Sequence, residues 1–371
     1  MMATRPAKAE APAGAAFAVL EIDLDAVAAN WRLLRAAHGG LPTAAVVKAD
    51  AYGLGARRVA PRLYAAGCRH FFVAHLEEAL TIRPLVPDAF IGVLNGPLPG
   101  TERAYRAHGI EPVLGSLGDI ARWVAFARRS DAAQPALIHI DTGMARLGLE
   151  PDELRVLAAE PERLEGILLR YVMTHLASAD MPGDTSAWEQ LRQFAAACTQ
   201  LPPAPRSIAN SAGLFLGGAF RSDLARPGAA LYGVNPGAGP NPMRPAVSLR
   251  ARVLQVRSLA VGEAVGYHAT WRAARPSRIA VVGVGYADGW PRALSNRGAA
   301  HFDGTTLPLV GRVSMDLSAY DATDRPEIGP GDWLELIGPR RPLEVVAAEA
   351  GTSAYETLTS LGRRYARVWR G

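Results

Sequence analysis

The rarity of lysine in this chain marks one position as chemically distinct. Of the 40 Lys and Arg residues in 371, only Lys8 and Lys48 are lysines, and Lys48 follows the small and apolar residues 44–47. An arginine stays protonated at any working pH, whereas a desolvated lysine can lose its proton and attack a carbonyl carbon. The position therefore predicts a Schiff-base lysine. A structural lysine whose stem packs at a strand end is the alternative.

Polar groups that could assist such a lysine recur further along the chain. They are Asp141-Thr142-Gly143-Met144-Ala145-Arg146, His175, Asn210-Ser211, and Arg226 with Gly228-Ala229. A hydroxyl group and backbone N–H groups beside a glycine are suited to binding phosphate. An amine opposite a phosphate loop is the arrangement that pyridoxal 5'-phosphate (PLP) needs, because its aldehyde bonds the amine while its phosphate anchors the other end. These residues predict PLP as the cofactor.

The elements that must position these residues follow an alternating pattern. Eight apolar runs occur at residues 44–47, 71–74, 91–94, 112–114, 137–140, 168–174, 207–209 and, more weakly, 224–226. Between them we expect helices that include residues 55–66, 76–85, 117–129, 151–159 and 186–199. Eight alternations favour a (β/α)8 TIM-type barrel, with an open doubly wound sheet as the alternative. In a barrel the carboxyl ends of the strands meet at one face, which would bring the candidate residues together.

The pattern changes after the Gly- and Pro-rich residues 237–242. Short β-type runs follow at 247–259, 278–285, 307–313 and 333–337, with small helices near 344–350 and 355–364. We therefore expect a PLP-binding barrel over residues 17–242 and a mostly β C-terminal domain over residues 243–371. A first strand at about residues 17–23 is a candidate to pair with that second domain. Residues 1–16, rich in Ala and Pro, are expected to form a disordered tail.

Composition excludes several classes of function. The formal net charge is +5, but the arginines are scattered and matched by acids, which argues against a nucleic-acid-binding surface. The apolar stretches are too short to span a membrane, and the N-terminus lacks the apolar core of a secretory signal. Cys68 and Cys198 are far apart, without metal-type spacing, so we expect free thiols, no metal and a cytoplasmic location.

Nine segments resemble the alanine racemase family. They are Val47-Lys48-Ala49-Asp50-Ala51-Tyr52-Gly53-Leu54-Gly55, Asp141-Thr142-Gly143-Met144 with Arg146, Thr174-His175, Ala209-Asn210-Ser211-Ala212, Arg226-Pro227-Gly228, Gly266-Tyr267, Gly285-Tyr286-Ala287-Asp288-Gly289, Gly311-Arg312-Val313-Ser314-Met315-Asp316 and Tyr355-Glu356. Their order is kept from about residue 18 to 369. The resemblance implies a PLP-dependent homodimer that interconverts L- and D-alanine through a PLP Schiff base and supplies D-alanine for peptidoglycan.

The resemblance also implies roles for individual residues. The two bases would be Lys48 and Tyr267, the latter reaching the site from the partner subunit, and Arg146 and Met315 would bind substrate. The cofactor would be bound by Lys48, Tyr52, Arg146, His175, Asn210, Ser211, Arg226, Gly228, Ala229 and Tyr355. Arg226 would face the pyridine nitrogen, where an arginine does not give up a proton and so limits side reactions. His175 is expected to orient Arg226.

Three positions depart from the family pattern. His139 stands where many relatives have a lysine that is carbamylated to hold the substrate-site arginine, so Arg146 must be positioned in another way. Ser314 replaces a frequent cysteine, and His268 follows Tyr267 where glycine is common. These changes bear on rate and pH optimum more than on reaction type.

Other functions remain open at this stage. A different racemase or a decarboxylase could use the same scaffold, although a decarboxylase is expected to place an acid at the pyridine nitrogen. A non-catalytic PLP-binding protein would resemble the barrel alone. A barrel enzyme that uses Lys48 as an aldolase-type base would carry no cofactor.

Overall fold

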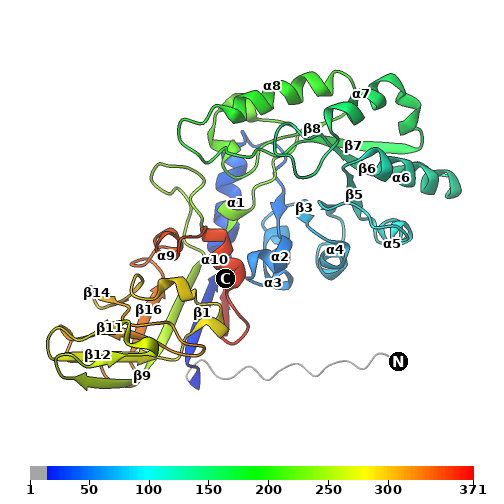
Figure 1. Cartoon of the computed structure of the whole chain (residues 1–371). Coiled ribbons are helices and arrows are strands. Elements are labelled where there is room, and N and C mark those ends of the chain that lie inside the picture. The colour runs from blue at the N-terminus through cyan, green and yellow to red at the C-terminus, as the bar shows by residue number, and fades with distance from the viewer. Residues whose placement is uncertain (1–14) are drawn as a thin grey trace, which may run out of the picture. The chain divides into compact units, whose positions relative to one another are not determined.

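The computed structural model describes residues 15–371, which form two compact units. The first, called the barrel unit here, comprises Asp25–Arg244 (Figure 1). The second, called the β unit, comprises residues 15–24 together with Pro245–Gly371. Most of the tail expected at residues 1–16 lies outside the described residues. No helix within residues 15–371 is long and apolar enough to cross a membrane.

The barrel unit is built on a parallel sheet. Its strands pair in chain order: β2 (Ala45–Val46), β3 (His70–Val73), β4 (Phe90–Val93), β5 (Glu111–Leu114), β6 (Gln134–His139), β7 (Ile167–Met173) and β8 (Arg206–Ser207). Residues 224–226 then join the two edges, because Leu224 N–H donates to Arg206 O at 3.2 Å and Ala44 N–H donates to Ala225 O at 2.8 Å. The predicted barrel is confirmed, closed by a short irregular eighth segment, and the open sheet is excluded.

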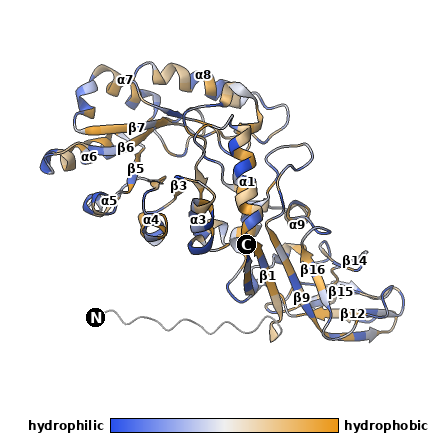
Figure 2. Cartoon of the chain, turned by 180° about the vertical axis from the view of Figure 1, so that it is seen from behind, coloured by the Kyte–Doolittle hydropathy of each residue, from blue (hydrophilic) through white to orange (hydrophobic). Residues whose placement is uncertain are grey.

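Helix α1 precedes the strands of this unit, and the other helices alternate with them. The helices are α1 (Leu24–Ala37), α2 (Lys48–Tyr52), α3 (Ala56–Ala65), α4 (Leu76–Ile82), α5 (Glu102–His108), α6 (Leu117–Arg129), α7 (Pro151–Ala159) and α8 (Ser186–Cys198). Figure 1 shows α3 to α8 in an arc outside the strands, and Figure 2 shows both hydrophilic and hydrophobic residues on α3 and α4. The predicted bounds of α6 and α7 are confirmed. The sequence pattern did not predict helix α5. Only Tyr105 in it is buried, so its apolar periodicity is weak.

Five of the seven strands each contribute one side chain to the buried core of the barrel, and the segments that close it contribute two more. This core consists of Ala44, Val46, Phe72, Val113, Leu137, Met173 and Leu224. A packed barrel interior leaves the strand ends, not the centre, as the place where polar side chains can gather. The core therefore holds the candidate residues at the carboxyl face.

The β unit is organised around one long strand. Strand β9 (Val247–Leu259) pairs with β1 (Ala18–Asp23), β12 (Ser277–Val282) and β16 (Trp333–Ile337), and β1 also pairs in parallel with β17 (Ala366–Arg370). The remaining elements are β10 (Ala264–Val265), β11 (Trp271–Arg272), β13 (Ala299–Phe302), β14 (Thr305–Pro308), β15 (Ser318–Asp321), α9 (Leu343–Ala350) and α10 (Ala354–Ser360). The expectation of a mostly β second domain is confirmed.

Three predicted elements of the β unit are longer in sequence than in structure. The strand expected at 278–285 ends at Val282. The strand expected at 307–313 ends at Pro308. The helix expected at 355–364 ends at Ser360, because Leu361 leaves the helical conformation, with ψ 115°, and Gly362 N–H donates to Asp288 O at 2.8 Å. A backbone partner distant in the sequence thus overrides the local helical pattern.

Phe72 offers a test of the barrel core, because its side chain is fully buried. We expect Phe72→Ala to lower the free energy of unfolding by about 3–5 kcal/mol, since it removes apolar contacts and leaves a cavity. The exposed Leu98 is the control, and Leu98→Ala should change stability by no more than about 0.5 kcal/mol. Urea denaturation of both variants measures the difference, and equal costs would contradict this description of the core.

Candidate active site

After Lys48 the chain leaves the barrel strand in a left-handed turn, which is the segment labelled α2. Residues 49–52 all have φ between 53° and 56°, which is the left-handed helical region. An L-residue in this conformation costs roughly 1–2 kcal/mol, so four in succession need compensating contacts. One is the Asp50 carboxylate, which accepts the Ala56 N–H at 2.7 Å where α3 begins. The turn after Lys48 is therefore held by specific hydrogen bonds and not by backbone preference.

A cavity of about 720 Å³ lies above the strand ends beside Lys48. Its polar lining includes Lys48, His75, Glu78, Asn95, His139, Arg146 and His175. Burial lowers the pKa of Lys48 below its usual value, and the nearby Arg146 lowers it further, while Glu78 opposes the shift. This favours an amine that reacts as a nucleophile or base, which is not expected of a lysine that only packs at a strand end.

Backbone hydrogen bonds in the loop after β6 fix the turn that precedes Arg146. The Asp141 carboxylate accepts the N–H groups of Gly143, Met144 and Ala145, each at 2.9 Å, and Ala145 has φ 53°. Arg146 follows this turn, and within residues 15–371 its guanidinium makes no hydrogen bond or ion pair. A planar cation that lines a cavity without a partner is suited to a carboxylate ligand.

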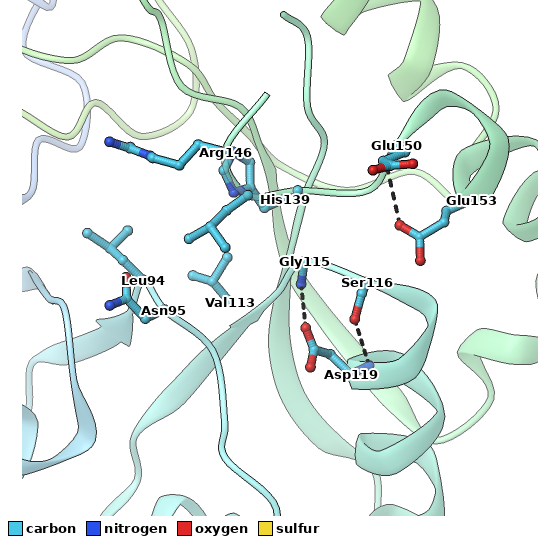
Figure 3. Close-up of a pocket in the computed structure, with 12 residues that line it drawn as sticks. Leu94, Asn95, Val113, Gly115, Ser116, Asp119, His139, Arg146, Glu150 and Glu153 are labelled. Carbon is cyan, nitrogen blue, oxygen red and sulfur yellow. Dashed lines mark hydrogen bonds between the residues drawn. The ribbon is translucent and has the colours of Figure 1, made fainter. Parts of the chain in front are cut away.

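A second cavity of about 480 Å³ adjoins the first and shares His139 and Arg146 with it (Figure 3). The acids on its far side already cap helices: Asp119 accepts the Gly115 N–H at 3.1 Å, and Glu153 accepts the Leu117 N–H at 3.0 Å. Burial, with a contribution from Arg226, lowers the pKa of His139 to about 4, so the ring is neutral at neutral pH. Here Arg146 is positioned by the backbone contacts of Asp141 without an anionic group at position 139.

Arg226 is a buried cation, with 3% of its surface exposed. Its Nη1 donates to Ser207 Oγ and its Nη2 to Thr174 O, both at 2.5 Å, and the described chain gives it no carboxylate partner. Burial lowers its pKa only to about 10, so it remains protonated at neutral pH. His175 was expected to orient Arg226, but its ring makes no hydrogen bond to the guanidinium among the described contacts. The guanidinium instead bonds Ser207 and the carbonyl of Thr174, the residue before His175. Burial and the nearby Arg226 lower the pKa of His175 to about 3, which leaves that ring neutral.

Hydroxyl and N–H groups converge around Gly228. Ser211 Oγ accepts the N–H groups of Gly228 at 2.9 Å and Ala230 at 3.3 Å. A Cβ atom at Gly228 would lie 2.3 Å from Tyr52 Oη, so only glycine allows this close approach. Ala229 begins the short helix Ala229–Tyr232 at the same point. Hydroxyl and backbone N–H groups gathered beside a glycine are the kinds of donor that bind a phosphate group.

The side-chain amides of two residues support the site, and the sequence predicted only one of them as a site residue. Asn210, expected to bind cofactor, uses its side chain to join two loops: it donates to Leu176 O, in the segment after β7, at 3.3 Å and accepts the Gly213 N–H of its own loop at 2.9 Å. Gln190 was not selected, yet it donates to His175 O at 2.9 Å and to Thr142 Oγ1 at 3.2 Å. A glutamine on the buried face of a helix carries no sequence signal that distinguishes it from a surface residue.

Three further predicted site residues belong to the β unit. Tyr267 is 67% exposed, Met315 54% and Tyr355 50%. Asn296 links the loops that carry the first two, since it donates to Thr270 Oγ1 at 3.2 Å and accepts the Gly311 N–H at 2.6 Å. His268 has φ 62°, a left-handed conformation that glycine adopts more readily than other residues. Tyr267 and Met315 thus lie on neighbouring exposed loops of one unit.

Family models account for nearly the whole chain. The model "Alanine racemase, N-terminal domain" matches residues 22–236, and "Alanine racemase, C-terminal domain" matches residues 246–369. The chain belongs to the alanine racemase family. The second match also excludes a PLP-binding protein that resembles the barrel alone.

Individual racemases are similar over almost their full length. An alanine racemase of Acidiphilium cryptum is 57% identical over 350 residues, which cover 94% of this chain and 98% of that protein. A protein of Agrobacterium fabrum named as a catabolic alanine racemase is 49% identical, with 96% and 93% covered. The crystal structure of alanine racemase from Bartonella henselae with covalently bound pyridoxal phosphate matches with a TM-score of 0.93 and 44% identity, covering 96% of this chain and 100% of that one.

The neutral His139 of this racemase-family chain predicts a pH dependence of stability. Its pKa is about 4 in the folded chain against an ordinary 6.5. The unfolded chain therefore binds more protons in this window, and His139 should lower stability as pH falls from about 6.5 towards 4. In His139→Asn, the loss of melting temperature between pH 7 and pH 5 should be smaller than in the unaltered chain.

Thermal denaturation at several pH values measures this loss. His108→Asn makes the same change at an exposed position and should leave the pH dependence unaltered. Identical curves for His139→Asn and the unaltered chain would contradict a neutral, buried His139.

Proposed function

We propose that this chain interconverts L- and D-alanine with PLP bound covalently to Lys48. The observation that carries the proposal is that the lysine amine and the proposed phosphate cradle follow neighbouring segments of the barrel. Val46 N–H donates to Pro227 O at 3.0 Å, so the segments that lead to Lys48 and to Gly228 are bonded neighbours at one barrel edge. The covalently bound PLP of the Bartonella henselae relative supports the same cofactor here.

The residues of the barrel unit fit this cofactor at both ends. Ser211, Tyr52, Gly228 and Ala229 would hold its phosphate, and Lys48 its aldehyde carbon. When bound, PLP withdraws electrons from the α-carbon of the amino acid, which makes the α-proton acidic. Arg226 would face the ring nitrogen as a cation, because its two bonds to Thr174 and Ser207 hold a guanidinium that gives up no proton at neutral pH.

Racemisation needs a base on each side of the α-carbon, since a proton leaves one face and returns to the other. We assign Lys48 to one face and Tyr267 of a partner subunit to the other. Arg146 would bind the substrate carboxylate with its free guanidinium, assisted by the Met315 backbone N–H. The assignment supports a homodimer, because Tyr267 and Met315 are exposed together on linked loops of the β unit.

We further propose that the D-alanine serves peptidoglycan synthesis in the cytoplasm. The catabolic name of the Agrobacterium fabrum relative marks the rival role, in which D-alanine is consumed. Deletion of the corresponding gene distinguishes the two roles. Growth that depends on added D-alanine would support the biosynthetic role, and growth without it would contradict that role.

Lys48→Arg tests the covalent assignment. We expect the unaltered protein to show the absorbance band of lysine-bound PLP and to convert L-alanine to D-alanine, and the variant to lose both, because arginine cannot bond the aldehyde. Lys8→Arg removes the only other lysine and should keep both. A protein that stays colourless after PLP is added would contradict the cofactor, and a variant that keeps its band and activity would contradict the role of Lys48.

Tyr267→Phe tests the second base. If each base serves one face, exchange of the α-proton with solvent should fall much more for one alanine enantiomer than for the other. Exchange measured by NMR in deuterated buffer gives the two rates. Undiminished exchange of both enantiomers would remove Tyr267 from the mechanism.

Subunit mixing provides the companion test of the shared site. Lys48→Ala and Tyr267→Ala subunits, inactive alone, should regain up to about a quarter of the unaltered activity when mixed, because a mixed dimer has one intact site of two. Absence of any recovery after verified subunit exchange would contradict a site completed by the partner.

A further inference from the structure

The carboxylate of Glu78 joins two elements beside Lys48. Its Oε1 accepts the Ala49 N–H at 2.6 Å, and its Oε2 accepts the N–H groups of Ala74 at 2.8 Å and His75 at 3.3 Å. Ala49 is the first residue of the left-handed turn and directly follows Lys48. Ala74 and His75 connect β3 to α4. The three contacts tie the lysine turn to the neighbouring strand end.

Helix capping explains only part of this arrangement. Glu78 lies in the first turn of α4, and a glutamate there commonly reaches back to the N–H of the residue that precedes the helix. The bonds to His75 and Ala74 meet that description. The shortest bond, to Ala49, crosses to an element 29 residues earlier in the chain and satisfies no donor of α4. It engages the turn whose backbone conformation is unfavourable for L-residues.

We propose that Glu78 is a positioning residue for Lys48: its carboxylate holds the left-handed turn that aims the lysine side chain and places a negative charge beside the amine. The inference deepens the proposed function and rests on it for the consequence for PLP attachment. Glu78 would touch neither the substrate nor the cofactor. It would act through Ala49 and through its charge.

The charged and titratable groups around Lys48 make this charge significant. The lining of the cavity brings Arg146 from the loop after β6, His139 from β6, His175 from the end of β7, and His75 from the start of α4. His139 and His175 are neutral at neutral pH, and Arg146 is a cation. Glu78 is the only carboxylate among the described residues that line the cavity. It opposes the lowering of the Lys48 pKa by burial and Arg146.

The test compares full-length Glu78→Gln, Glu78→Asp and Glu77→Gln, each freed of PLP with hydroxylamine and then titrated with PLP from pH 6 to 10. We expect Glu78→Gln to weaken attachment roughly tenfold, because an amide cannot accept all three N–H bonds. Its pH midpoint for attachment should fall, because removing the negative charge favours the unprotonated amine. Glu78→Asp should weaken attachment while nearly keeping the midpoint, since it retains the charge but is one methylene too short. Glu77→Gln removes an exposed neighbouring carboxylate and should match the unaltered protein.

A second measurement decides the role of Glu78 without PLP. The chain has only two lysines, so 13C-methylation of the lysines gives NMR signals in which Lys48 is separated from Lys8 by Lys8→Arg. The Lys48 pKa should be lower in Glu78→Gln than in Glu77→Gln. An unchanged Lys48 pKa and unchanged PLP attachment, with only the melting temperature lowered, would overturn the proposal and leave Glu78 as a helix cap. If the unaltered protein fails to attach PLP, the proposed function fails, while the Lys48 pKa still decides whether Glu78 acts on the amine.

Discussion

The hydrogen bonds between residues 44–46 and 225–227 are the contacts on which the site depends. They close the sheet, and they place the segment that leads to Lys48 against the segment that leads to Gly228. These two segments are about 180 residues apart in the chain. A phosphorylated aldehyde can bridge an amine and a phosphate cradle only if their separation is held constant. Barrel closure is therefore the condition under which Lys48 and Gly228 would bind the two ends of the proposed cofactor, and the packed interior supports it.

The electrostatic character of the site follows from burial and from an excess of positive groups, with Glu78 as the one carboxylate among the described residues that line the cavity. Arg226 is a cation held by a carbonyl and a hydroxyl, Arg146 is free to meet a carboxylate, and Lys48 is an amine with a lowered pKa. The two histidines between these cations are kept neutral by burial and by neighbouring positive charge. The site thus attracts anionic groups such as phosphate and carboxylate and retains one amine able to exchange a proton.

Backbone strain is concentrated where residues must be aimed. Residues 49–52, Ala145 and His268 all adopt left-handed conformations, and they flank Lys48, Arg146 and Tyr267 respectively. In the first two cases a carboxylate, from Glu78 or Asp141, accepts the N–H groups of the turn. The shared principle is that an unfavourable turn directs a side chain and an acid stabilises the turn.

The sequence by itself determined the order of strands and helices, the change from a barrel to a β domain, and the residues at the strand ends. These properties depend on local periodicity and on motifs read in chain order, as at α6, α7, β9 and β16. Only the tertiary structure decided that Thr174 and Ser207, not the His175 ring, bond Arg226, and that Gln190 and Glu78 support the site. Those contacts join residues distant in the chain, and their partners follow from barrel closure and burial, which no local pattern contains. Lys48 stands out in composition, but the conformation that aims it is a property of the folded chain.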